Sequence, residues 1–139
     1  MVMQHFVVCL LSATLVAGCA FNQYQNDISN NQYYEKQIYA DANAAYVGEW
    51  SAATDIGIRS IKIKEDGRIK VCLAASSGTE DGKVYMDNGK PAIIIRTGAK
   101  ITIVNIDKDF LLLEVYGKQE KYHAGLIDAA CVPSFKNFD

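Results

Sequence analysis

Few side chains in this chain of 139 residues have the type and spacing needed for catalysis. Nucleophilic catalysis requires a base beside a serine, threonine or cysteine, and His123 is the only histidine after residue 18. It lies in the strand-like stretch 121–125, where a single histidine is typically a packed or surface residue. Asp107 and Asp109 could act as an acid–base pair. Because Lys108 separates them in a turn-like segment, their pattern indicates a solvated turn.

The remaining polar clusters are also typical of turns rather than of catalytic or ligand-binding sites. Glu80-Asp81 and Asp87-Asn88 each precede a glycine, and no twelve-residue calcium-ligand pattern follows them. Ser76-Ser77-Gly78 lacks the G-x-S-x-G frame of a nucleophile elbow, and the sequence has no phosphate loop and no CxxC or HxxxH spacing. We therefore expect a protein that is not an enzyme and that uses no metal and no cofactor.

Charge and composition narrow the class of partner. Lys and Arg number 14 against 16 Asp and Glu, a formal charge of −2. This balance gives no basic footprint for nucleic acid and no polybasic patch for anionic lipid. Half of the residues are hydrophobic and 22% are charged, which suits one packed domain.

The N-terminal residues predict export. Residues 6–17 read FVVCLLSATLVA, which is too short to span a bilayer as a helix but typical of the apolar region of a secretory signal. The block Leu15-Val16-Ala17-Gly18-Cys19 then resembles the lipobox of bacterial lipoproteins. The resemblance implies that residues 1–18 are a signal peptide and that Cys19 carries lipid through its thiol. It also implies anchoring by several acyl chains. The alternative is a buried N-terminal helix with an ordinary Cys19.

The residue after Cys19 bears on the destination. Ala20 stands there in place of Asp, which under the common enterobacterial sorting rule resembles a lipoprotein of the outer membrane. We expect the domain to face the periplasm.

The lipoprotein resemblance also affects the other cysteines. With Cys9 in the signal and Cys19 lipidated, Cys72 and Cys131 remain, and in an exported chain such a pair predicts a disulfide. Alternation places Cys72 on the same side as Lys70, so the bridge should lie on the outer or edge side of a sheet. Two separate buried thiols or a metal pair are the alternatives.

Residues 19–45 are rich in Asn, Gln and Tyr and predict a tether. Ser29 and Gln32 have the spacing of a capping box. Tyr34, Ile38, Ala42 and Ala45 then share one helical stripe. We expect a short helix that docks on the domain, and the alternative is a solvated linker throughout.

From Tyr46 onward the sequence consists of short β-rich runs. Asp-Gly and Asn-Gly pairs between them favour tight hairpins, and alternation such as Ile61 and Ile63 against Lys62 predicts one inward face. Later runs such as 93–95 and 110–113 are apolar on both faces and need cover. Residues 46–139 therefore predict a mainly β domain, an antiparallel up-and-down barrel or sandwich of about eight strands. The expected strands are 46–51, 58–64, 68–74, 83–86, 92–96, 101–106, 110–116 and 121–126, with a closing piece near Cys131.

Gly48-Glu49-Trp50 resembles the Gly-x-Trp opening of lipocalins, in which the tryptophan plugs one end of the barrel. The alternative is a core tryptophan beside a close-packed glycine. In size and layout the chain is also similar to small uncharacterised lipoproteins of gammaproteobacteria, to lysozyme inhibitors and to immunity proteins against toxins.

Two classes of function follow. The first is a membrane-anchored, non-enzymatic module that binds an envelope protein or has a structural role, inhibition of a lysozyme or toxin being one form of it. The second is a lipocalin-like carrier of a small apolar ligand, which requires an apolar cavity of about 300 Å³ or more. Large aliphatic side chains at inward positions favour the first class.

Overall fold

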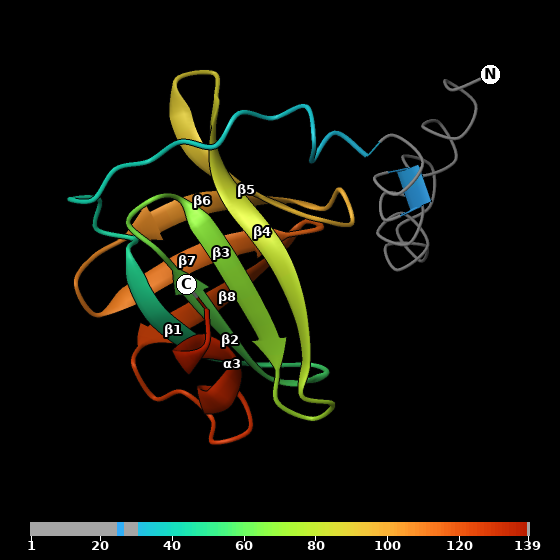
Figure 1. The fold of residues 1–139 in the computed structure, drawn as a ribbon, viewed down its shortest axis with the longest axis vertical. Coiled ribbons are helices and arrows are strands. Elements are labelled where there is room, and N and C mark those ends of the chain that lie inside the picture. The colour runs from blue at the N-terminus through green and yellow to red at the C-terminus, as the bar shows by residue number, and fades with distance from the viewer. Residues whose placement is uncertain (1–24, 27–30, 139) are drawn as a thin grey trace.

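The computed structural model describes residues 25–26 and 31–138. The expected signal peptide, Cys19 and Ser29 lie outside the described residues. The described chain forms eight strands and a short helix (Figure 1). These elements are β1 Gly48–Thr54, β2 Gly57–Ile63, β3 Arg68–Leu73, β4 Gly78–Asp87, β5 Lys90–Ile95, β6 Lys100–Ile106, β7 Phe110–Val115, β8 Lys118–Ala124 and α3 Val132–Lys136.

The strands close into an up-and-down antiparallel barrel. Each strand pairs with the next along the chain, and β1 also pairs with β8. The hairpin turns follow the expected chemistry at the β4–β5 connection, where Asn88 and Gly89 have φ of +51° and +80°. The prediction of a mainly β antiparallel fold is confirmed, and the fold is a barrel rather than a sandwich.

Alternate residues of the strands fill the barrel interior. Ile61 and Ile63 point inward on β2, and their neighbours Lys62 and Lys64 do not enter the core. Each of the following inward side chains is at most 1% exposed: Ile61, Ile63, Ile69, Val84, Ile93, Leu111, Leu113 and Tyr122.

One end of the barrel, which we call the closed end, is covered by residues 39–47. Tyr46 is buried against the core, and its carbonyl oxygen accepts a 2.8 Å hydrogen bond from Nε1 of Trp50. The backbone N–H of Tyr39 donates to the carbonyl of Val84 at 2.8 Å. Tyr39 also lies so close to Gly67 that a Cβ there would be 2.4 Å from its carbonyl oxygen. The tether therefore docks tightly on the barrel.

The helix expected in the tether is wrong for the described part, because residues 31–47 form turns and extended chain. Tyr34 and Ile38, the expected docking stripe, are exposed. Tyr33 docks in their place and covers Tyr85 and Ile94 on the outer face of β4 and β5. Backbone bonds from the barrel and the burial of Tyr33 outweigh the weak helical preference of this short segment.

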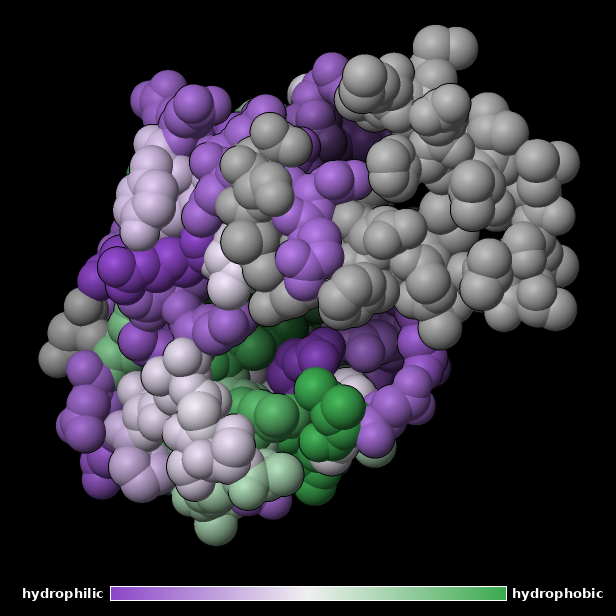
Figure 2. Space-filling view, turned by 90° about the vertical axis from the view of Figure 1, so that its right-hand side faces the viewer, coloured by the Kyte–Doolittle hydropathy of each residue, from purple (hydrophilic) through white to green (hydrophobic). Residues whose placement is uncertain are grey.

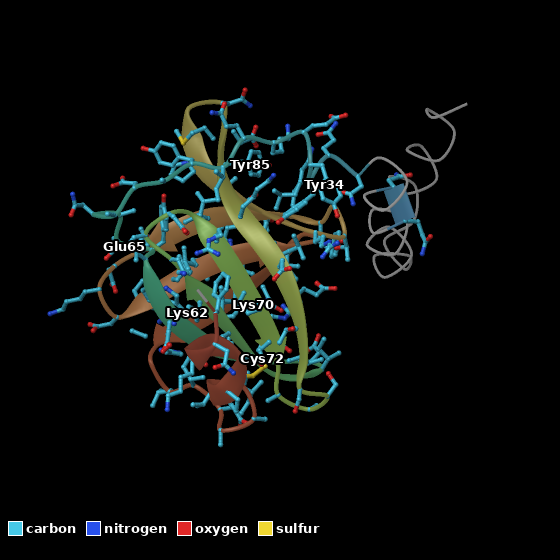
Figure 3. All side chains as sticks on the ribbon, in the orientation of Figure 1. Tyr34, Lys62, Glu65, Lys70, Cys72 and Tyr85 are labelled. Atoms are coloured by element: carbon cyan, nitrogen blue, oxygen red, sulfur yellow. A yellow bond between two sulfur atoms is a disulfide. The ribbon has the colours of Figure 1, made fainter. Side chains whose placement is uncertain are left out.

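The C-terminal segment lies on the outer face of the first strands (Figure 3). The closing piece expected near Cys131 is the helix α3 rather than a strand. The Cys72–Cys131 disulfide is confirmed, with Cα atoms 5.8 Å apart, and Nζ of Lys62 donates to the carbonyl of Phe135 at 3.0 Å. Cys72 faces outward, as alternation predicted.

Two hydroxyl groups are also buried on this outer face of the barrel. Ser51 and Ser60 are cross-strand partners on β1 and β2, and their Oγ atoms are 2.6 Å apart. Each hydroxyl is the other's hydrogen-bond partner, which offsets part of the cost of burying these polar atoms.

One expected turn was placed wrongly. Glu80-Asp81-Gly82 lies inside β4, which begins at Gly78, and the turn between β3 and β4 falls at residues 74–77. Gly82 has a packing role in the strand, since a Cβ there would be 3.1 Å from both the carbonyl oxygen of Ile94 and Cδ1 of Ile95. A glycine in a strand can thus mark close approach rather than a turn.

Candidate functional site

The side chains considered for catalysis lie apart on the structure. His123 is exposed on the outer face of β8. Asp107 uses Oδ1 to accept from the backbone N–H groups of Asp109 and Phe110, at 2.7 and 3.0 Å, so it shapes the β6–β7 turn. Asp81 forms an ion pair with Lys70 at 2.6 Å. Oγ of Ser76 accepts from the backbone N–H of Gly78 in the β3–β4 turn.

The described residues hold neither a cluster of metal ligands nor a helix that could span a membrane. Nowhere in that part of the chain do three His, Cys, Asp or Glu side chains gather as a metal site. No helix within the same residues has the length and hydropathy needed to cross a bilayer.

The opposite end of the barrel, which we call the mouth, carries the β1–β2, β3–β4 and β7–β8 turns and holds a polar cluster inside the barrel. Arg59 shares the inward face of β2 with Ile61, because the two residues are two positions apart. Its cross-strand partner on β1 is Ala52. The small alanine leaves room for the guanidinium to pass over β1 and reach β8.

On β8 the guanidinium meets Glu120 and Tyr122. Nη1 of Arg59 is 2.7 Å from Oε1 of Glu120 and 3.3 Å from the hydroxyl of Tyr122. The Tyr122 hydroxyl in turn donates to the same Oε1 at 2.8 Å. The side chains of Arg59 and Glu120 are 21% and 12% exposed, so this ion pair is far less screened by water than one on the surface.

The cluster shifts the pKa values of two of its members. Burial disfavours the charged form of Arg59, but Tyr122 and then Glu120 outweigh it and raise the pKa of the guanidinium. Burial raises the pKa of Tyr122 well above its ordinary value, although Arg59 acts in the other direction. At neutral pH the guanidinium of Arg59 is therefore charged and the phenol of Tyr122 is neutral.

These side chains also close a gap in the barrel wall. The ladder between β1 and β8 is short: Trp50 pairs with Ala124 and Ser51 with His123, and the backbone N–H of Gly125 donates to the carbonyl of Glu49 at 2.9 Å. Nearer the mouth, Arg59 joins β2 to β8, and Lys118 forms an ion pair with Asp55 between the β7–β8 and β1–β2 turns. The polar cluster therefore joins β8 to the first strands near the mouth, as backbone hydrogen bonds join neighbouring strands elsewhere in the barrel.

A pocket of about 350 Å³ opens at the mouth beside Arg59. Val71 and Leu73 form its apolar wall, and Ile56, on the β1–β2 turn, is 58% exposed at its edge. Figure 2 shows this side of the molecule, with apolar side chains gathered in a hollow in the lower half of the view and polar ones around them. The remaining lining residues are Ser76, Gly78, Thr79 and Glu80.

The arrangement provides groups that could bind a ligand. It offers a fixed cation, an apolar wall and the carboxylate of Glu80, which is exposed and forms no ion pair with any described residue. Sequence reasoning missed this site because Arg59, Glu120 and Tyr122 are scattered along the chain. The sequence held one indication of the site, because Arg59 lies two positions before Ile61 and therefore belongs to the same inward-facing set as Ile61 and Ile63.

A second depression lies on the outer surface beside β1 and β2. It measures about 460 Å³, and Gly48, Glu49, Lys62, Lys64 and Asp66 are among its lining residues. Its charges are of both signs, so it offers no single electrostatic preference.

Comparison with protein families, with curated proteins and with solved structures finds no match to this chain.

Proposed function

We propose that this protein is a lipoprotein, anchored in the outer membrane through Cys19, whose barrel binds an envelope protein at its mouth. The filled barrel interior is the observation that carries the proposal. The inward side chains of the middle layers are at most 1% exposed, Ile61, Ile93 and Leu113 among them. A carrier of an apolar ligand needs an empty apolar volume at that place.

The mouth supports a protein partner more directly. Ile56 is exposed beside a pocket with apolar walls and a fixed charge. Apolar groups around a desolvated polar anchor are typical of the residues that dominate protein interfaces. The volume of about 350 Å³ is open to the surface and lined partly by Arg59 and Glu80, which suits a side chain of a partner better than a wholly apolar molecule.

Site-specific photo-cross-linking in cells tests the binding proposal. A photoreactive residue replaces Ile56, and the matched control replaces Val104, which is also an exposed aliphatic residue but lies on β6 away from the pocket. We expect a discrete protein adduct from position 56 and none of the same mass from position 104. Identical adducts at both positions, or lipid alone at position 56, would contradict the proposal.

The anchor is tested separately by metabolic acyl labelling. Label on the wild-type chain that disappears in Cys19→Ala is the expected result, because the thiol is the acceptor of the diacylglyceryl group. Equal labelling of both chains would overturn the assignment of Cys19.

A further inference from the structure

The guanidinium of Arg59 has donors that the barrel does not use. Both of its hydrogen bonds leave from Nη1, toward Glu120 and Tyr122. Nε and Nη2 donate to no described residue, and the side chain retains 21% exposure while it lines the pocket at the mouth. Both nitrogens keep contact with solvent, so a ligand that enters the pocket can reach them.

The geometry of a guanidinium limits what those donors can bind. The N–H bonds of Nε and Nη2 point the same way, in the plane of the group, and match the two oxygens of a carboxylate. The bonds to Glu120 and Tyr122 fix the plane from the Nη1 side. The open side of the group is therefore held in place before any ligand arrives, which reduces the entropy lost on binding.

The surrounding charges disfavour a ligand that carries two negative charges. Glu120 already offsets much of the positive charge of Arg59, and Glu80 lies on the rim of the same pocket. A phosphate dianion would be repelled more strongly by these two carboxylates than a monoanion would. Val71 and Leu73 offer apolar contact to a short methylene chain next to the charge.

We propose that the Nε–Nη2 side of Arg59 receives a glutamate side chain of the partner protein at the mouth. This assignment rests on the proposed function and names the chemistry of the contact. A glutamate has two methylene groups for the apolar wall and one planar carboxylate for the donors, whereas the mouth offers no comparable match to a bulky or dianionic group.

The direct test follows the Arg59 Nε–H resonance of the ¹⁵N-labelled full-length protein by NMR. The probes are N-acetylglutamate N-methylamide and the corresponding glutamine compound, which differ only in the charge of the side-chain head group. We expect millimolar binding of the glutamate probe, and binding of the glutamine probe that is weaker by about tenfold or more. Equal shifts with both probes, or no shift with the glutamate probe, would overturn the assignment.

Two variants separate this contact from a general effect of charge. Arg59→Lys keeps a cation near Glu120 but lacks the planar pair of donors, so its affinity for the glutamate probe should fall by about tenfold. Arg96→Lys is the matched control on the exposed β5–β6 turn and should bind the probe as the wild type does. An Arg59→Lys protein that folds and binds the probe with wild-type affinity would refute the role of Nε and Nη2.

Cross-linking from position 56 distinguishes the two proposals. If the wild-type adduct persists undiminished in Arg59→Lys, the carboxylate contact is wrong although the mouth still binds a protein. If position 56 yields no adduct at all, the proposed function itself fails. Hexanoate that binds more than about tenfold tighter than the capped glutamate would point to a free carboxylate ligand instead and overturn the partner assignment.

Discussion

At the closed end the chain itself covers the barrel, whereas at the mouth the inward-facing residues meet solvent. The closed end buries Tyr46 and Trp50 under residues that pass directly over Gly67. The mouth leaves Arg59 half-buried beside a pocket and Ile56 exposed. Both ends belong to one barrel with one continuous core, so the difference shows where the chain covers that core and where it leaves the core open to solvent.

The largest expected effect is at the closed end. Trp50→Ala removes a buried aromatic side chain and should lower the free energy of unfolding by about 3–5 kcal/mol. Ile56→Ala, its counterpart at the mouth, should change it by less than about 0.5 kcal/mol because that side chain is mainly exposed. Urea unfolding measures both. Comparable losses in the two variants would mean that the mouth is also part of the structural core.

Two glycines test how tightly the tether packs on the closed end of the barrel. Gly67→Ala would place a Cβ 2.4 Å from the carbonyl oxygen of Tyr39 at a φ of +89°, so we expect a loss of about 2–3 kcal/mol. Gly117→Ala, in the β7–β8 turn, has a similar φ of +79° and no described atom within 4 Å of the new Cβ. Its loss should be about 1 kcal/mol, from the backbone alone. Equal losses in thermal unfolding would show that the chain at Tyr39 moves aside freely.

Two tyrosines allow the same chemical change at each end. The buried hydroxyl of Tyr46 has no hydrogen-bond partner among the described residues, so Tyr46→Phe should leave stability unchanged or raise it slightly. The hydroxyl of Tyr122 bonds to both Glu120 and Arg59, and Tyr122→Phe should lower stability by about 1–2 kcal/mol. Denaturation at neutral pH checks the sign of each effect, and a loss at Tyr46 as large as that at Tyr122 would contradict the comparison.

Alkaline pH should act on the mouth through Tyr122. Burial raises the pKa of this phenol in the folded protein, whereas in the unfolded chain it titrates near 10. Above that pH the unfolded state binds fewer protons than the folded state, so the free energy of unfolding falls as pH rises. The contribution of Tyr122 to the free energy of unfolding is fully present below about pH 10. Between about pH 10 and 11 the wild type should lose about 1 kcal/mol more than Tyr122→Phe. Parallel pH profiles of the two proteins would contradict a raised pKa.

Much of the barrel could be predicted from local sequence. The inward set of β2 and β3, for instance Ile61 and Ile69, follows from alternation, because one buried face imposes a period of two. Asn88-Gly89 predicts the β4–β5 turn for an equally local reason, because each of these residues adopts a positive φ. The outward position of Cys72 followed from its alternation with the inward residues of the same strand. Its disulfide with Cys131 followed from the lipoprotein resemblance, which leaves these two cysteines as a pair.

The errors arose where distant contacts override local preference. Asp81-Gly82 has the composition of a turn, yet Gly82 lies in β4, where a Cβ would be only 3.1 Å from Ile94 and Ile95 on the neighbouring strand. The helical stripe at Tyr34 and Ile38 is present in the sequence, but the barrel binds the tether in extended form. The polar cluster at the mouth could not be assembled from the sequence, since Arg59 and Glu120 are 61 positions apart.

The short ladder between β1 and β8 has a consequence for the order of folding. Every other ladder joins consecutive strands, so the meander can grow hairpin by hairpin at little loop-closure entropy. The β1–β8 pairing has a long sequence separation and is short, with two residue pairs and one further backbone hydrogen bond, from Gly125 to Glu49. We therefore expect closure of this seam to be the last step. Since Arg59 and Glu120 lie on opposite sides of it, Glu120→Gln should mainly speed unfolding in stopped-flow measurements and leave the folding rate almost unchanged. The proposed binding surface at the mouth would then form only when the barrel closes.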